Sequence, residues 1–301
     1  MPYRYNVRID FCGNWVNRLK KQLKELGYDV KESGYNVAIN YFNLKKRLIE
    51  PIKRKVLVSK EFKCPKNLKS GLNLLIKKIE NGEDIRLYLS RNIMSSPFSI
   101  FFINKFNYND DLLNDWGIYH LHLGTEVDKK TNFIKRTKYL LFARFDEKYA
   151  YFINIYKHGA WTKQEMIKIL HKNWPESIEK FRMRDIGCIA PKLTDEEYKK
   201  LRKKHLISLI EAEKGAVYFP LGRGYMASGD STEEIELCDY YFNLFKNYEK
   251  YIKINIVQIV KILKNEGAKI DNKLHFYLWL EGNKVYAYEL LSNSKIELGS
   301  L

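Results

Sequence analysis

Three strand-like segments follow one another closely in the middle of the chain, and this spacing constrains the fold most. They span residues 118–123, 138–145 and 149–156, and each is rich in aromatic and β-branched residues. Only Asp146-Glu147-Lys148 separates the last two. Closely spaced strands joined by short turns pair antiparallel. The pattern therefore predicts an antiparallel meander at the centre of the molecule.

The flanking regions have a different character. Before the meander, the patterns predict a strand near 3–10, a helix from Asn14, a strand at Lys55–Val58 and a helix over 68–79. A further strand is predicted at 98–103. After the meander, capped helical stretches end in a hairpin over 275–291. We therefore expect an α+β fold with an N-terminal α/β part (1–95), a central sheet domain (96–190) and a mostly helical C-terminal part (191–301).

The charge of the chain favours a polyanionic partner. Lys and Arg number 53 against 36 Asp and Glu, which gives a formal net charge of +17. Such a field attracts nucleic acid and speeds its encounter with the protein. The alternative is that many of the lysines only solvate helix faces. We favour nucleic acid as the partner, and RNA over DNA.

The spacing of the cysteines and the hydropathy of the chain indicate the cellular compartment in which the protein is expected. The four cysteines form no CxxC or CxxH pair, so the usual zinc spacing is missing and no metal or cofactor is expected. Four free thiols fit a reducing cytoplasm. The chain opens with a strand-like pattern rather than a signal peptide, and no apolar run has the length of a membrane span. We expect a cytoplasmic protein without a membrane partner.

The meander also carries the residues best suited to chemistry. Strand alternation puts His120 and His122 on one face, opposite a face of Tyr119, Leu121 and Leu123 that should be the core. The third strand runs into His158, which shares a face with Tyr156. The second strand and its approach add cations that can hold phosphate: Arg136, Lys138 and Arg144.

RNA cleavage without a metal needs such a set of groups. A base removes the ribose 2′-OH proton, an acid protonates the leaving 5′-oxygen, and cations stabilise the charged phosphorane. Histidine fills both proton-transfer roles because its ordinary pKa lies near neutrality. Two other interpretations stay open: the histidines are hydrogen-bonded structural residues, or His120, His122 and His158 hold a metal.

A second candidate binding segment is the glycine-rich stretch 218–231. Gly222 and Gly224 allow the backbone to approach a phosphate, Arg223 can pair with it, and Ser231 opens a helix N-terminus. The spacing matches neither a Walker A loop nor a dinucleotide fingerprint. Two tight turns that lead into a capped helix explain the same residues without a ligand.

The stretches 115–124, 136–142 and 151–159 resemble the RelE/ParE superfamily of bacterial toxins. Those stretches carry DWGIYHLHLG, RTKYLLF and YFINIYKHG. The resemblance covers about residues 96–160 and implies a sheet whose face carries the residues that cleave mRNA without a metal. Members have a basic strand where this chain has His-Leu-His, and this chain lengthens the first hairpin by Thr125–Phe133. The match therefore carries over only to these positions: His120, His122, Arg136, Lys138 and His158.

The sequence thus predicts a metal-independent endoribonuclease, acting as a toxin or phage-defence effector, with an antitoxin or regulatory protein as a further partner. His120, His122 and His158 would transfer protons, while Arg136, Lys138, Arg144 and Tyr156 would hold the nucleic acid. The alternatives are a non-catalytic nucleic-acid-binding protein, and a sensor that binds a nucleotide or phosphate at the stretch 218–231.

Overall fold

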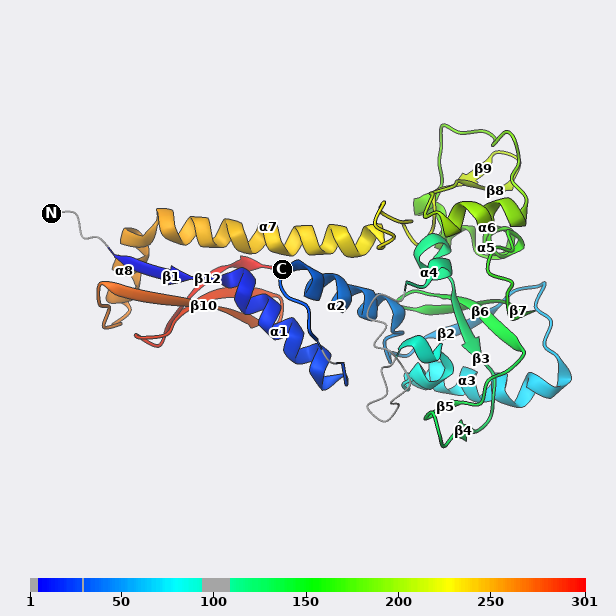
Figure 1. Cartoon of the computed structure of the whole chain (residues 1–301), viewed down its shortest axis with the longest axis horizontal. Helices are drawn as coiled ribbons and strands as arrows, with labels where there is room; N and C mark the ends of the chain where they lie inside the picture. The colour runs from blue at the N-terminus through cyan, green and yellow to red at the C-terminus, as the bar shows by residue number, and fades with distance from the viewer. Residues whose placement is uncertain (1–4, 29, 94–108) are drawn as a thin grey trace. The chain divides into compact units, whose positions relative to one another are not determined.

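The computed structural model describes residues 5–28, 30–93 and 109–301. The chain forms two compact units (Figure 1). One joins Met1–Tyr41 to Glu236–Leu301, and the other is Phe42–Ile235. The chain passes from one unit to the other within helices α2 (Tyr35–Arg47) and α7 (Thr232–Ile254). This division differs from the predicted boundaries after residues 95 and 190, because the two ends of the chain pair with each other, and no local pattern reveals such a pairing.

The first unit is built on a four-stranded sheet formed by both ends of the chain. Its strand order is β1 (Asn6–Ile9), β10 (Lys273–Glu281), β11 (Lys284–Glu289) and β12 (Ser294–Ser300). β1 pairs parallel with β10, and the other pairs are antiparallel. Helices α1 (Phe11–Glu25) and α8 (Ile256–Asn265) belong to the same unit. The core includes Trp15 of α1, whose indole packs against Tyr241, Phe242 and Phe245 of α7.

The second unit contains the predicted meander. Its sheet has the order β2 (Lys55–Val58), β7 (Tyr149–Lys157), β6 (Tyr139–Phe145) and β3 (Tyr119–His122). β3, β6 and β7 pair antiparallel, which confirms the meander, and β2 joins β7 in parallel. Together with the helices around both sheets, this confirms the α+β fold class.

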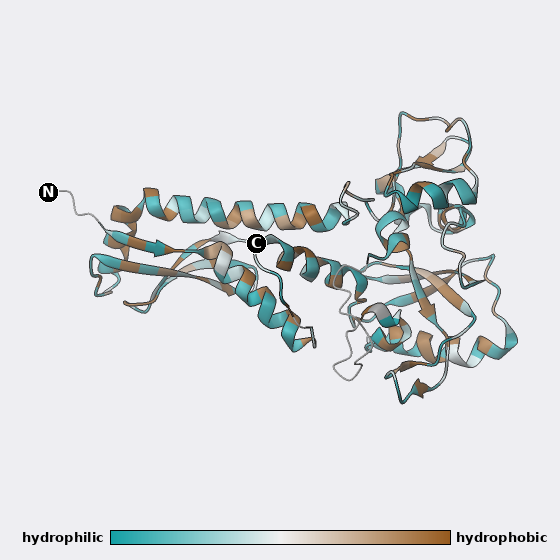
Figure 2. Cartoon of the chain, viewed as in Figure 1, coloured by the Kyte–Doolittle hydropathy of each residue, from teal (hydrophilic) through white to brown (hydrophobic). Residues whose placement is uncertain are grey.

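Both faces of this sheet are buried, although the sequence pattern predicted one core face. On one face, Leu75 of α3 (Lys69–Asn81) packs in a cluster with Leu121 and Leu141. On the other face, Ile167 of α5 (Glu165–Asn173) packs in a cluster with Phe142. Figure 1 shows α3 and α5 on opposite sides of the sheet, and Figure 2 shows brown, apolar stretches among the strands of this sheet. The histidine-bearing face is therefore covered along much of its length.

Smaller elements complete the second unit. Helices α4 (Asp111–Trp116) and α6 (Asp195–Lys203) and the hairpin β8 (Ile210–Glu213) with β9 (Ala216–Tyr218) add to the α5 side. Thr194 and Glu197 form a capping box at the start of α6. The remaining elements are the hairpin β4 (Val127–Asp128) with β5 (Phe133–Ile134) and the short 3-10 helices Lys66–Leu68, Arg86–Tyr88, Arg91–Ile93, Pro175–Ser177 and Glu179–Phe181.

Two further sequence predictions can be compared with the structure. The strand predicted at 98–103 cannot, because it lies outside the described residues. The four cysteines, all of them described, are free thiols, as expected. Within the described ranges, no helix combines the length and the apolar composition that a membrane crossing requires.

Candidate active site

A cavity of about 450 Å³ lies in the second unit, where the ends of β3 and β7 approach α4 and α6. Sites for small molecules usually span about 300–1,000 Å³, so the cavity has room for a ligand of nucleotide size. Segments far apart in the sequence contribute to its lining. The lining residues whose side chains can bind a ligand or transfer a proton are Asp110, Asp111, His120, Arg136, His158, Trp161, Lys199, Arg202 and Lys203.

His120 is an enclosed titratable group in the lining of the cavity. It pairs with Phe142 across β3 and β6, and its side chain is 11% exposed. Its Nδ1 lies 3.6 Å from Oδ2 of Asp110, and its ring centroid lies 4.8 Å from that of Trp161. Burial lowers the pKa of His120, while the Asp110 carboxylate opposes that shift. The ring is therefore neutral at neutral pH, and one of its nitrogens faces a carboxylate.

His158 reaches the same indole from the end of β7. Its backbone N–H donates to the carbonyl of Lys138 at 2.9 Å, which continues the β6–β7 pairing by one residue. The His158 ring is edge-on to Trp161, with centroids 4.9 Å apart, and the residue is exposed. Trp161 thus contacts one enclosed histidine and one exposed histidine, and both line the cavity.

Two consecutive carboxylates stand at the start of α4. Asp110 caps the helix, because its Oδ1 accepts the backbone N–H of Leu113 at 3.1 Å while its Oδ2 faces His120. Asp111 is partly buried, and burial raises the pKa of its carboxyl group. Within the described part of the chain, no hydrogen bond or ion pair engages the Asp111 side chain.

Cations line other parts of the cavity. Arg136 precedes β6 and donates to the carbonyl of Leu89 at 3.3 Å. Lys199 and Lys203 are exposed, and their spacing of four residues puts them on one face of α6. Lys199 also forms an exposed ion pair with Glu196 at 3.3 Å, which water screens.

Arg202 supports the cavity from within. Its guanidinium is paired with Asp115 of α4 at 2.8 Å, lies 4.3 Å from the Trp116 ring centroid and donates to the backbone carbonyl of Trp161. Burial raises the pKa of Asp115 to about 6, although the adjacent guanidinium favours the charged form. This buried pair joins α6 to α4 and holds the segment that carries Trp161.

His122 does not reach the cavity, although strand alternation correctly put it on the face of His120. It is 2% exposed, and its Nδ1 accepts the backbone N–H of Thr137 at 3.0 Å. Burial, reinforced by the charge of Arg136, lowers the pKa of His122 to about 3. The ring is therefore a neutral, buried acceptor, which fits the structural interpretation of this histidine.

Two of the predicted phosphate-binding cations also lie elsewhere. Lys138 is exposed and does not line the cavity. Arg144 lies towards the other end of β6, with its guanidinium 5.4 Å from the ring centroid of Phe181. Burial lowers the pKa of Arg144. Of the cations predicted from the meander, the structure brings only Arg136 to the two histidines.

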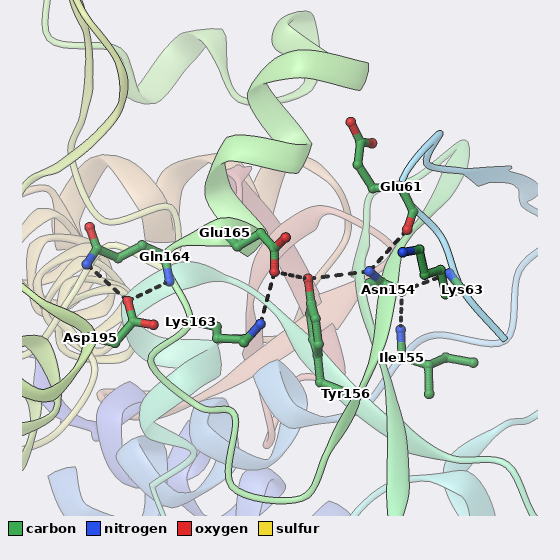
Figure 3. A network of polar contacts seen from close by, with 9 residues as sticks. All are labelled: Glu61, Lys63, Asn154, Ile155, Tyr156, Lys163, Gln164, Glu165 and Asp195. Atoms are coloured by element: carbon green, nitrogen blue, oxygen red, sulfur yellow. Dashed lines mark hydrogen bonds and ion pairs between the residues drawn. The ribbon is translucent and has the colours of Figure 1, made fainter. Parts of the chain in front are cut away.

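Tyr156 belongs to a separate polar network (Figure 3). Its hydroxyl donates to Glu165 at 2.9 Å, and Lys163 lies 4.5 Å from its ring centroid and 3.1 Å from the same carboxylate. Asn154 approaches the hydroxyl from the other side, at 3.5 Å. Burial and the Glu165 carboxylate raise the pKa of Tyr156. These contacts join β7 to α5 rather than leaving the Tyr156 ring free to stack on a nucleobase.

The Gly222–Ser231 loop uses its hydrogen-bond donors within the protein. The backbone N–H groups of Gly222 and Gly224 donate to the carbonyls of Asp115 and Asn114, each at 2.9 Å. Ser231 is fully buried, and its hydroxyl accepts from the Lys46 ammonium at 2.7 Å. Arg223 is exposed and adopts a left-handed φ of 72°. The loop fits the ligand-free interpretation, in which tight turns pack against the end of α4.

The structure thus adds residues that the sequence patterns did not connect with the site. Asp110, Asp111, Trp161, Lys199 and Lys203 line the cavity beside the predicted histidines. The four-residue spacing of the two lysines was the available signal, but it does not reveal what the helix faces. Among the described residues, no three His, Cys, Asp or Glu side chains converge as metal ligands.

Comparisons with protein-family models, with curated proteins and with solved structures gave no match.

Proposed function

We propose that the protein is an endoribonuclease that cleaves RNA without a metal, through His120 and His158. One observation carries the proposal. Two histidines from different strands contact the same indole inside a cavity of nucleotide size that cations also line. Internal cleavage of RNA needs a base, an acid and positive charge around one phosphate, and this cavity contains all three.

His120 is suited to act as the general base. Its lowered pKa keeps the ring neutral and able to accept the proton of a ribose 2′-OH. With Nδ1 facing Asp110, Nε2 is the nitrogen that takes this proton. The Asp110 carboxylate then stabilises the imidazolium, as a carboxylate does for a catalytic histidine in other enzymes.

The remaining groups complete the reaction. The deprotonated 2′-oxygen attacks phosphorus, the bond from phosphorus to the 5′-oxygen breaks, and His158 supplies the proton that this oxygen needs. The products are a 2′,3′-cyclic phosphate and a free 5′-hydroxyl. Arg136, Lys199 and Lys203 stabilise the negative charge that grows on the phosphorane. A cytoplasmic toxin or phage-defence role, with an antitoxin or regulatory partner, extends this proposal and agrees with the resemblance to RelE/ParE toxins.

The test compares RNA cleavage by the full chain and by its histidine variants in the presence of a chelator. His120→Ala, His158→Ala and the double variant should each lower the cleavage rate by about 10²–10⁴-fold, the range expected for loss of a general acid or base. His275→Ala, on β10 of the other unit, is the matched control and should cleave at the wild-type rate.

Circular dichroism and thermal melting establish that each variant is folded. A folded double variant that cleaves RNA as fast as the wild type would reject the assignment of the two histidines. A wild-type protein that binds RNA but leaves it intact would identify a non-catalytic RNA-binding protein instead.

A further inference from the structure

The cavity has acidic groups as well as cations. Asp110 and Asp111 stand at the start of α4, while Arg136, Lys199 and Lys203 lie on other segments of the lining. Phosphate groups explain why cations are needed, but they do not explain a carboxylate, which repels them. A ligand that suits this lining carries an anionic group together with hydrogen-bond donors, and a nucleotide whose nucleobase presents donors is such a ligand.

The two carboxylates are not equivalent. Oδ1 of Asp110 accepts the cap hydrogen bond of α4, while Oδ2 lies 3.6 Å from Nδ1 of His120. The Asp111 backbone carbonyl accepts the Tyr225 hydroxyl at 2.5 Å, which fixes the main chain at this point. Among the described residues, nothing hydrogen-bonds or ion-pairs with the Asp111 carboxylate. The main chain of Asp111 is therefore fixed next to Asp110, and the Asp111 carboxylate is available to accept hydrogen bonds from a ligand in the cavity.

A carboxylate distinguishes the four RNA bases by their edges. It accepts hydrogen bonds with two oxygens and donates none when ionised. Guanine alone presents two adjacent donors, N1–H and the N2 amino group, and so pairs with both oxygens. Adenine and cytosine each present one amino group beside a ring-nitrogen acceptor. The N3–H of uracil stands between two carbonyl oxygens, and these repel a carboxylate.

We infer that Asp111 is a specificity-determining residue that binds the Watson–Crick edge of guanine in the nucleotide that supplies the attacking 2′-hydroxyl. This inference rests on the proposed ribonuclease function and adds the substrate preference of the same cavity. Because Asp111 follows Asp110 directly, the base reader and the support of the general base are fixed by one helix start. Cleavage should therefore occur on the 3′ side of guanosine.

The test is to map cut sites in a random-sequence RNA pool. Sequencing of the cleaved ends identifies the nucleotide that carries the 2′,3′-cyclic phosphate. For the wild-type chain, guanosine should exceed uridine at this position by roughly 5- to 150-fold, the range for a bidentate base contact. Asp111→Ala should reduce the guanosine-to-uridine ratio to below about threefold, whatever its overall rate. Asp185→Ala, an exposed carboxylate outside the cavity lining, is the matched control and should keep the wild-type ratio.

A second measurement needs no variant. A pool transcribed with inosine in place of guanosine lacks the N2 amino group, so the preference for that nucleotide should fall. Cuts spread evenly over the four nucleotides, or a guanosine preference that survives in Asp111→Ala or with inosine, would overturn the role of Asp111 and leave the ribonuclease proposal standing. An intact pool after long incubation with the wild-type chain would overturn the ribonuclease proposal and this inference with it.

Discussion

The cavity and the Gly222–Ser231 loop are both candidate phosphate-binding sites, yet they use their polar groups in opposite ways. In the cavity, His158, Lys199 and Lys203 are exposed side chains around a space that a ligand can enter. In the loop, the amides of Gly222 and Gly224 donate to backbone carbonyls. A glycine beside a cation allows either a phosphate or another protein segment to approach the backbone closely. In this loop, the backbone of α4 makes the close approach.

If this contrast is right, changes near the loop should alter stability and changes in the cavity should alter RNA binding or cleavage. The largest effect is expected at Glu234, three residues after Ser231. Its side chain is 1% exposed, and Asn43 Nδ2 donates to both of its oxygens at 3.4 Å. Burial raises its pKa from 4.5 to about 7, although Lys46 opposes this shift.

A carboxyl group whose pKa is higher in the folded state binds its proton more tightly there than in the unfolded chain. Its contribution to stability is therefore complete below pH 4.5 and is lost as the pH rises through about 7. The loss amounts to about 3 kcal/mol at most. Glu234→Gln should match the wild type near pH 4.5 and exceed its free energy of unfolding at pH 8.

Urea denaturation across this pH range measures the effect, with the exposed Glu176→Gln as a control for removal of a charge. Cleavage by Glu234→Gln should stay at the wild-type level. If Glu234→Gln lost cleavage without changing its stability, the region around the Gly222–Ser231 loop would also take part in the reaction.

The next effect is expected at Gly222. A Cβ atom at this position would overlap the carbonyl oxygens of Leu113 and Asn114, and neither backbone group can move without disturbing α4. Gly222→Ala should therefore lower the free energy of unfolding by about 1–3 kcal/mol. Gly187→Ala is the matched control, because a Cβ there meets no atom within 4 Å.

Thermal melting and urea denaturation compare the two variants. Nucleotides and inorganic phosphate should stabilise wild type and Gly222→Ala equally. A stability equal to that of the wild type, combined with lost phosphate binding, would mean that the glycine serves a ligand rather than packing.

Sequence patterns predicted the meander because its information is local. Alternating residues and the turn Asp146-Glu147-Lys148 define β6 and β7 within a few residues, and β2 matches its predicted bounds. The same alternation correctly put His120 and His122 on one face. It cannot show that Thr137 meets His122 while Asp110 and Trp161 meet His120, because those contacts depend on how distant segments fold over the sheet.

The site residues that the sequence patterns did not predict also depend on contacts between segments that are distant in the sequence. Lys199 and Lys203 lie about eighty residues beyond β3 and resemble any solvated pair on a helix until the tertiary structure brings α6 to the cavity. The pairing of β1 with β10 is even less local, and it explains why the predicted domain boundaries differ from the two units.

The smallest expected effect is on the salt dependence of RNA binding, and it distinguishes the cations that line the cavity from those outside it. Each phosphate contact that a lysine makes contributes about 0.7 to the slope of log binding constant against log salt for single-stranded nucleic acid. Lys203→Ala should therefore reduce this slope by about 0.7 when RNA binding is measured by fluorescence anisotropy in the His120→Ala/His158→Ala background, in which the RNA survives. Arg223→Ala, on the loop, and Lys138→Ala, outside the cavity, should leave the slope unchanged. A reduction by Arg223→Ala as large as that by Lys203→Ala would make the loop a nucleic-acid contact after all and would remove the distinction between the two regions.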